Sequence, residues 1–398
     1  MNKLKTTALS AALVAMSAPA IAEEASWGIS GWINQSMTYF DDGDTSDIVN
    51  SGDNGTTLGS RITLSGSTPL AGTGLSAGFE VIVEPTSFGA GDPLTTANQD
   101  VFESSNDFGK SINLLSNNLH ISGGFGKLTF GTQSMPTDNI AVLADPSLTL
   151  WSSISPIFRG NAFQIQDTAA GTTWGSFLHC LATPGLGIGI DCNGVYRNGV
   201  RYDLPAFGPV SVAVGYANDD IFDIAVKYSG TIGGMTANVH GGYAYNADGG
   251  INTGAAVLGN GSETWQIQAG LMDPNSGLFG SIAYQAEETE DSVAGNNGDD
   301  TDAWWLKVGI KKNWVGYGDT AISVNYGQYN DQYGNLGTTA GVTGSEVERF
   351  GVSVDQYFGS NLIIYALYRS LELDVSGTNA FDGADDLDTF TLGFTYFF

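Results

Sequence analysis

Residues that could carry covalent chemistry are few in this chain. The sequence has three histidines, His120, His179 and His240, and two cysteines, Cys180 and Cys192. The histidines are too scattered to indicate a catalytic triad or a metal motif. Two cysteines without a nearby histidine pair also make a poor zinc site, although His179 adjoins Cys180. We therefore expect no enzyme and no required cofactor, and we expect Cys180 and Cys192 to form a disulfide bond in an oxidising compartment.

Charged side chains are the remaining candidates for function. The chain has 42 acidic residues against 14 lysines and arginines, a net charge of −28. This surplus of acids excludes nucleic acid as a partner, because phosphate contacts need clustered cations. Acidic stretches could instead bind Ca²⁺ through several carboxylate oxygens, but they do not match the EF-hand pattern, and solvated loop charge is the competing interpretation. The candidate ligands are Asp41, Asp42, Asp44, Asp299, Asp300 and Asp302.

The N-terminus has the pattern of a secretory signal peptide. Lys3 and Lys5 precede a short apolar run, and an Ala-Ile-Ala site ends at Ala22. We therefore divide the chain into a signal peptide at residues 1–22 and one domain at 23–398. Removing the signal leaves 12 basic residues against 42 acidic ones, a net charge near −30. No later stretch reaches 18 consecutive apolar residues, so we expect no transmembrane helix.

Segments of about ten residues that alternate between apolar and polar side chains follow one another from Ser26 to the end. In the last one, Phe390, Leu392, Phe394 and Tyr396 share one face and threonines occupy the other. Only 14% of residues are charged, against about 25% in soluble domains, while mean hydropathy is −0.02. We predict sixteen strands, starting near residues 26, 57, 75, 117, 126, 196, 208, 220, 234, 262, 277, 302, 318, 346, 361 and 386.

The two faces of these strands distinguish a barrel from a soluble sandwich. The apolar face is branched and aromatic, as lipid requires, and the other is mostly Gly, Ser, Thr and Asn, as a wet lumen requires. An even strand count lets the last strand pair with the first, which leaves no open edge in lipid. Short turns also alternate with long acidic connections, for example 41–54 and 287–302. The sequence therefore predicts an all-β protein, a sixteen-stranded antiparallel transmembrane β-barrel.

Alternation also assigns charged residues to the lumen. Ile62 and Leu64 must face lipid, so Arg61 faces inward. The same reasoning at Val200 and Tyr202 turns Arg197, Arg201 and Asp203 inward, because Arg on the lipid face would cost roughly 2–4 kcal/mol. Five tryptophans near predicted strand ends are candidates for interfacial aromatic girdles: Trp27, Trp32, Trp304, Trp305 and Trp314.

Four motifs carry a resemblance to the general trimeric porins of Gram-negative outer membranes. The stretch 60–66 (SRITLSG) resembles the family's second strand, and 124–133 (GFGKLTFGTQ) resembles the hairpin that leads into the constriction loop. The stretch 198–208 (NGVRYDLPAFG) resembles the strand and turn that follow that loop. The C-terminal Tyr396-Phe397-Phe398 is similar to the aromatic signal read by the barrel-assembly machinery.

The resemblance implies a homotrimer in which the long third loop, here 134–195, folds into the lumen. Family members place acids on this loop opposite arginines on the wall. The candidate acids here are Asp138, Asp145, Asp167 and Asp191, with solvated loop residues as the competing interpretation for each. Arg61 and Arg201 match the family's wall arginines best, and Arg159 is a candidate tether. The loop's length and its cysteine pair depart from the family pattern.

The sequence thus favours a porin in the outer membrane that passes ions and small hydrophilic solutes by passive diffusion. Its expected partners are outer-membrane lipid, lipopolysaccharide and the barrel-assembly machinery. A substrate-selective porin, for example for sugars, would want a line of aromatic side chains in the lumen, and Tyr357 and Tyr365 are the candidates. An exported adhesin without a channel would share the signal peptide and acidity but would not need lipid-facing alternation. An outer-membrane phospholipase or protease would need a histidine paired with Ser or Asp at the rim.

Overall fold

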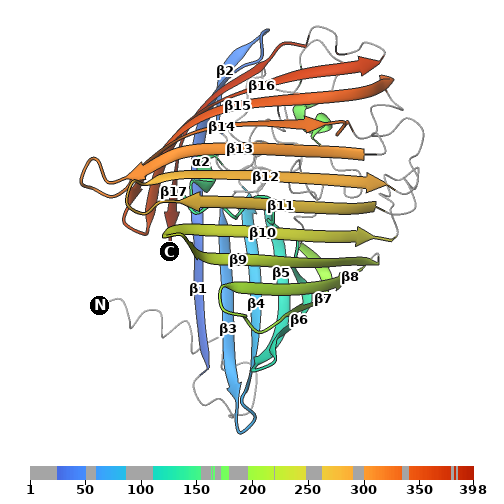
Figure 1. The fold of residues 1–398 in the computed structure, drawn as a ribbon, viewed down its shortest axis with the longest axis vertical. Coiled ribbons are helices and arrows are strands. Elements are labelled where there is room, and N and C mark those ends of the chain that lie inside the picture. Colours follow the sequence, from blue (N-terminus) through green and yellow to red (C-terminus); the bar gives the residue numbers. More distant parts are fainter. Residues whose placement is uncertain are drawn as a thin grey trace.

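The protein folds into one antiparallel sheet that curls into a barrel (Figure 1). The computed structural model describes residues 25–50, 60–86, 111–153, 163, 165, 172–178, 196–218, 220–247, 262–289, 300–333, 340–377, 381 and 384–398. The predicted signal peptide lies outside them. The strands are β1 (Ser26–Asp41), β2 (Ser46–Asn50), β3 (Arg61–Leu70), β4 (Leu75–Thr86), β5 (Ser111–Gly123), β6 (Gly126–Ser134), β7 (Tyr196–Asp203), β8 (Val210–Ala217), β9 (Ile221–Ile232), β10 (Met235–Asn246), β11 (Ser262–Met272), β12 (Leu278–Thr289), β13 (Asp300–Lys312), β14 (Thr320–Asn330), β15 (Val342–Phe358), β16 (Leu362–Gly377) and β17 (Leu387–Phe397).

These strands fill sixteen positions around the ring. β2 and β3 both pair with β1, β2 from Met37 to Asp41 and β3 from Ser26 to Trp32, so they lie end to end in one position. β17 closes the ring by pairing with the other edge of β1 along ten residues, from Trp32↔Phe397 to Asp41↔Asp388. The predicted sixteen-stranded antiparallel barrel is confirmed, and most predicted strand starts lie within about two residues of those observed.

One predicted connection is wrong. The sequence places residues 41–54 in a long loop, but Ser46–Asn50 forms β2. The chain reverses within four residues because the Asp42 carboxylate accepts hydrogen bonds from the backbone N–H groups of Asp44 (3.3 Å) and Thr45 (2.8 Å). Gly43, between Asp42 and Asp44, has φ +86°, a conformation that favours glycine. The alternation in β2 is too short to separate from loop sequence.

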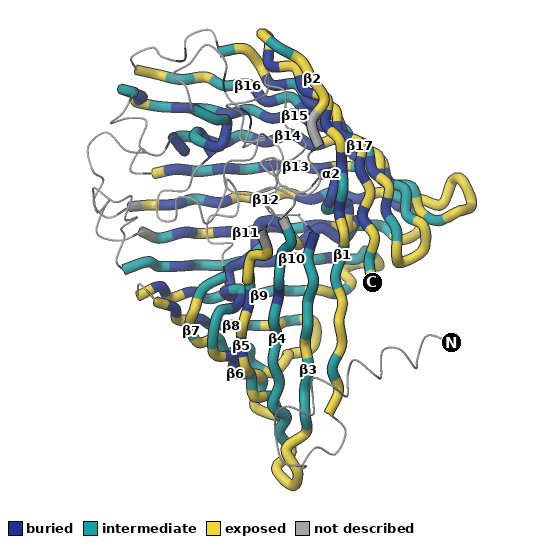
Figure 2. Tube along the Cα trace, turned by 180° about the vertical axis from the view of Figure 1, so that it is seen from behind, coloured by how far each residue is buried: buried dark blue, intermediate teal, exposed yellow. Residues whose placement is uncertain are grey.

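Exposure alternates along the strands as the sequence predicts (Figure 2). In β17, Phe394 and Tyr396 are each 51% exposed, whereas Thr395 between them is fully buried. Thr391, on the same face as Thr395, is 1% exposed. Many outward residues of the other strands are likewise apolar or aromatic, for example Leu119, Ile267 and Val308, so much of the barrel exterior is hydrophobic. No helix among the described residues is long and apolar enough to span a bilayer.

The stretch after β6 differs from the other connections. Residues 135–153, which end in the short helix α2 (Leu150–Ser153), are mostly buried and contact inward-facing residues of β9, β11, β13 and β15. A second short helix, η1 (Trp174–Phe177), is also buried.

The two ends of the barrel differ in their connections. The end with the turns 71–74, 124–125 and 233–234 is the short-turn end, and the opposite end is the long-connection end.

Adjacent residues on β5 test the assignment of the two faces. Leu119 is 67% exposed and points outward, while His120 lines a polar cavity inside the barrel. Leu119→Arg should lower the free energy of unfolding from bilayers by about 2–4 kcal/mol, because it places a charge in lipid. His120→Arg should cost clearly less, since the new charge would remain in water. Denaturant titration of vesicle-embedded protein measures both, and equal costs would contradict the assignment.

Candidate functional site

Arg61 lies on the inner wall and is already paired. Its Nε and Nη2 donate hydrogen bonds to Glu84 Oε1 on β4, at 3.0 and 2.6 Å. Its Nη1 donates to the Tyr196 hydroxyl on β7 at 3.4 Å, and its guanidinium lies 5.0 Å from the centre of the Trp32 ring. Because β3 and β7 are not neighbours in the sheet, the contact with Tyr196 crosses the interior. Arg61 therefore presents a fixed, partly exposed charge pair.

Arg201 forms a second charge pair on β7. Its Nε and Nη2 donate to Asp203 Oδ1 at 3.0 and 2.7 Å, and its Nη1 donates to the carbonyl of Ser134 at 2.9 Å. Lys127 on β6 lies 3.8 Å from the other Asp203 oxygen. Arg197 lies on the same face of β7 as Arg201. The arginine wall is therefore largely neutralised by carboxylates of the wall itself.

A polar cavity of about 640 Å³ lies beside these pairs, toward the short-turn end. It is lined by residues of β1 and of β3 to β7, among them the inward-facing Ser65, Glu80, Asn118, Lys127 and Arg201. Glu80 accepts hydrogen bonds from Ser116 and Asn118, both at 3.3 Å. This arc of the inner wall thus carries both signs of charge next to open space.

Asp138 and Asp145 are both buried, but in different electrostatic settings. Asp138 accepts hydrogen bonds from Ser134 Oγ and Asn139 Nδ2, each at 2.5 Å. Burial raises the pKa of Asp138, and the Ser134 hydrogen bond together with the charges of Lys227, Arg61 and Arg201 offsets this only in part. Asp138 is therefore close enough to Arg61 and Arg201 for their charges to act on its pKa.

Asp145 is held by Lys307 of β13 in a buried ion pair. Burial acts to raise the pKa of Asp145, but the Lys307 charge and hydrogen bonds from Lys307 and Ser147 outweigh it, so the pKa lies below the ordinary value. The Lys307 ammonium also donates to Thr149 Oγ1 at 2.9 Å and to Ser153 Oγ at 3.1 Å. Asp145 therefore anchors residues 135–153 to the wall.

Further contacts fix the same stretch along one arc of the barrel. Thr137 donates from its N–H and its hydroxyl to Asp223 Oδ2 on β9, both at 2.8 Å. The Ala144 N–H donates to Gln268 on β11 at 2.6 Å, and Ser152 donates to Asp355 on β15 at 2.5 Å. In a ring of sixteen positions, β11 lies across from Arg61 on β3 and β15 lies across from Arg201 on β7, whereas β9 is only two positions from β7.

Glu84, Lys307, Asp223 and Asp355 are site residues that the sequence analysis did not name. Alternation could have found their inward orientation: Lys307, for example, lies between the outward Leu306 and Val308. The sequence therefore held the signal for the side of each residue, but not for its partner across the barrel. The predicted residues Arg159, Asp167, Asp191, Cys180, Cys192 and Asp299 lie outside the described residues.

Two predicted girdle tryptophans are wrong. Trp305 is fully buried on the inner face and donates its indole N–H to the Ala141 carbonyl at 3.3 Å. Trp32 also points inward, where its ring meets that of Trp151 edge-on, with centroids 6.0 Å apart. Trp304 does face outward and packs on Tyr326, with ring centroids 5.5 Å apart. Nearness to a strand end did not decide the side, because alternation does.

The described part of the chain gathers no three His, Cys, Asp or Glu side chains into a set that could hold a metal ion. Asp42 instead stabilises the turn before β2, and Asp302 accepts hydrogen bonds from Asn330 at 3.3 Å. Asp41 accepts a hydrogen bond from the Gly43 N–H at 3.1 Å. Calcium binding at Asp41, Asp42, Asp44, Asp300 and Asp302 stays a prediction.

Solved outer-membrane structures share this fold. The anion-selective porin of Comamonas acidovorans is 18% identical, with a TM-score of 0.56 over 94% of this chain and 100% of that chain. OmpT of Vibrio cholerae in its trimer form is 14% identical, with a TM-score of 0.53 over 94% and 100%. The outer membrane channel DcaP of Acinetobacter baumannii is 12% identical, with a TM-score of 0.55 over 94% and 97%.

The sequence comparison is decisive for the family. No curated protein matches the chain significantly. A family model described as Gram-negative porin, however, matches residues 8–376, which is most of the chain. Together with the closed sixteen-stranded barrel, this places the chain in the outer membrane as a channel-type protein. The chain belongs to the Gram-negative porin family.

Proposed function

We propose that this chain is a general diffusion porin, a water-filled channel for the passive diffusion of ions and small hydrophilic solutes. The observation that carries the proposal is the division of the inner wall. Residues 135–153 follow the wall from β9, past the Asp145–Lys307 ion pair on β13, to β17 and β1, where Trp151 packs. The charge pairs lie on β3, β4 and β7 beside the polar cavity. A solute would pass between the two.

In this proposal the stretch 134–195 is the constriction loop, folded into the lumen. The support comes from its described part, since residues 135–153 are mostly buried and bonded to inward-facing side chains. Permeation needs a wet bore, a narrow point and a local field, and no catalytic group. We therefore infer a channel without enzymatic activity.

Ion preference would follow the local charges of the aperture. The net charge near −30 that remains after removal of the predicted signal peptide favours cations at the mouth. Within the aperture, Arg61 is balanced by Glu84 and Arg201 by Asp203, so neither sign dominates. We propose weak cation selectivity for this reason.

We further propose that the protein works as a homotrimer in contact with lipopolysaccharide, and that Phe398 serves as its assembly signal. The similarity to the trimer form of Vibrio cholerae OmpT supports the trimer. Phe398 is half-exposed at the closing edge, where its backbone exchanges two 3.1 Å hydrogen bonds with Gly31.

A sugar-selective porin is the nearest alternative, and the described aromatics do not favour it. Tyr365 is buried and donates to Asn34 Oδ1 at 2.8 Å, and Tyr357 donates to the Leu148 carbonyl at 3.0 Å. Swelling of proteoliposomes in sugars of graded size separates the functions. We expect rates that fall smoothly with solute size. A sharp preference for one sugar would favour the selective porin, and no swelling at all would favour the adhesin.

Removing Arg61 and removing its partner Glu84 should shift the ion preference of the channel in opposite directions. Arg61→Gln leaves the Glu84 carboxylate unpaired and should raise the cation-to-anion permeability ratio by about 1.5-fold or more. Glu84→Gln should lower it, and the double variant should return close to the wild type. Reversal potentials in a salt gradient measure all three. Unchanged potentials in both single variants would place the pair outside the permeation path.

Removal of one partner of the buried Asp145–Lys307 pair should loosen the constriction. Lys307→Gln leaves a buried carboxylate unpaired, which costs about 3–5 kcal/mol. We expect noisier channel currents and faster proteolysis of residues 135–153. The double variant Asp145→Asn with Lys307→Gln removes both charges and should recover part of the loss. A double variant worse than either single variant would contradict the anchor.

The same pair predicts the acid stability of the loop. Because the folded-state pKa of Asp145 is lowered, its contribution to stability is present above the pKa of an unfolded Asp, about 3.9. It is lost only as the pH falls through the lowered folded-state pKa. Proteolysis of the loop should therefore stay slow at pH 5, and fast cleavage in the wild type at that pH would contradict this.

A further inference from the structure

The inner wall near the long-connection end is not uniformly polar. From β13 through β17 to β1, the inward positions there carry large apolar side chains that are at most 1% exposed. These wall residues are Trp305, Tyr329, Val347, Leu371, Leu387 and Phe40. A wet lumen would leave such side chains in water at a large free-energy cost, so something apolar must cover them.

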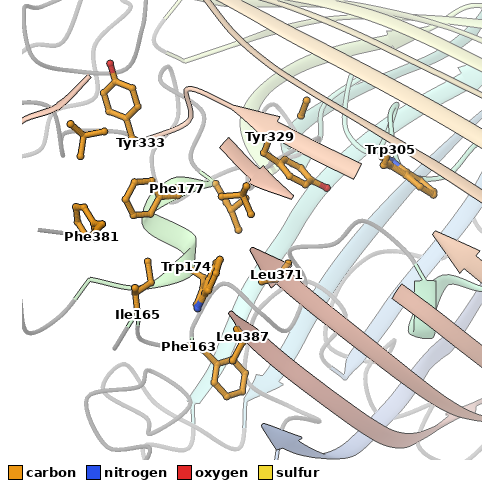
Figure 3. Close-up of a cluster of buried hydrophobic side chains, with 14 of the residues drawn as sticks. Phe163, Ile165, Trp174, Phe177, Trp305, Tyr329, Tyr333, Leu371, Phe381 and Leu387 are labelled. Atoms are coloured by element: carbon orange, nitrogen blue, oxygen red, sulfur yellow. The ribbon is translucent and has the colours of Figure 1, made fainter. Parts of the chain in front are cut away.

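The cover comes from the stretch between β6 and β7. Five of its side chains, here named the apolar plug, are fully buried: Phe163, Ile165, Trp174, Phe177 and Leu178. Phe163 packs on Phe40 of β1, with ring centroids 5.2 Å apart. Phe177 meets Phe381, from the connection between β16 and β17, edge-on at 5.0 Å. The close-up shows Trp174 and Phe163 beside Leu371 and Leu387 of the wall (Figure 3).

Backbone hydrogen bonds give the plug a defined shape. The Trp174 N–H donates to the Phe163 carbonyl at 2.9 Å, and the Ile165 N–H donates to the Thr172 carbonyl at 3.0 Å. These two bonds join the described residues Phe163 and Ile165 to Thr172 and Trp174 in an antiparallel pairing. The described part of the plug is thus held by backbone hydrogen bonds as well as by side-chain packing.

The opposite arc of the wall carries no such cover among the described residues. There the inward side chains are polar, including Glu84 and Arg61, which are partly exposed. Tyr333 and Phe381, which belong to connections at the long-connection end, join the apolar cluster only on the β13–β1 side. Among the described residues, the inner wall is therefore apolar and covered on the β13–β1 side, and polar and partly exposed around Arg61 and Glu84.

We propose that the apolar plug closes the β13–β1 side of the barrel at the long-connection end, so that solutes cannot reach the aperture along that side. This rests on the proposed channel function. The plug narrows the mouth, and its residues set the size cut-off together with the constriction. Trp174 and Phe177 contribute most to this cut-off because they are the largest plug side chains packed between the wall and the connections of the same side.

A double substitution tests the size cut-off. Trp174→Ser with Phe177→Ser makes the plug prefer water to the wall. Single-channel conductance should rise by about 1.5-fold, since conductance grows with open cross-section, and larger polyethylene glycols should enter the channel. Phe125→Ser, an exposed aromatic on a short turn, is the matched control and should change neither. Unchanged conductance and polymer exclusion in the double variant, with the plug released to protease, would overturn the proposal.

Hydrogen–deuterium exchange of the wild-type protein tests the plug without any substitution. The amides of Ile165 and Trp174 should exchange slowly, because both donate hydrogen bonds in a buried cluster. Rapid exchange of these amides in a folded barrel would overturn the plug even if the channel conducts. Slow exchange in a protein that conducts nothing would support the plug and count against the proposed channel function instead.

Discussion

The need to pair every backbone polar group inside lipid governs this structure. An unpaired N–H or carbonyl in the hydrocarbon region costs several kcal/mol, so a membrane sheet must close. Here closure falls on β1 and β17, which pair over ten residues and end in two hydrogen bonds between Gly31 and Phe398. Once the ring is closed, alternation gives each strand one face to lipid and one to the interior. The position of each inward side chain, and so the shape of the bore, follows from this closure.

The charged side chains of the interior are paired in two different ways. On the β3–β7 side the arginines are balanced by carboxylates on the same or the neighbouring strand, so the wall stays charged and accessible without help from the loop. On the β9–β15 side, the buried groups Asp223, Lys307 and Asp355 find partners in residues 135–153. The loop and this wall therefore stabilise each other, because the contact that buries these groups also supplies their partners, and removing one partner would leave the other buried and unpaired. Among the described residues, the bore is filled on this side.

Much of the fold was predictable from the sequence because a barrel strand is a local pattern. The faces of β17 and the inward positions of Arg61 and Arg201 follow from alternation alone. The short strand β2 could not be recognised, since five residues next to an acidic turn resemble loop sequence. The partners of the inward side chains could not be predicted for another reason. Alternation gives the face on which a side chain lies, but not the loop residue that it contacts, and Asp145 and Lys307 lie 162 residues apart. Trp305 lies on the inner face although it is near a strand end, because alternation with the outward Leu306, and not distance from the end, sets its side.

The central claim is that a water-filled path runs through this barrel beside the Arg61–Glu84 pair. The most direct test is the single-channel conductance of refolded protein in a planar bilayer with a salt gradient. We predict stepwise currents, grouped in threes for a trimer, with a reversal potential that shows weak cation preference. A barrel that is folded and inserted but shows no steps would contradict the account, because the space between the loop and the β3–β7 wall would then not conduct.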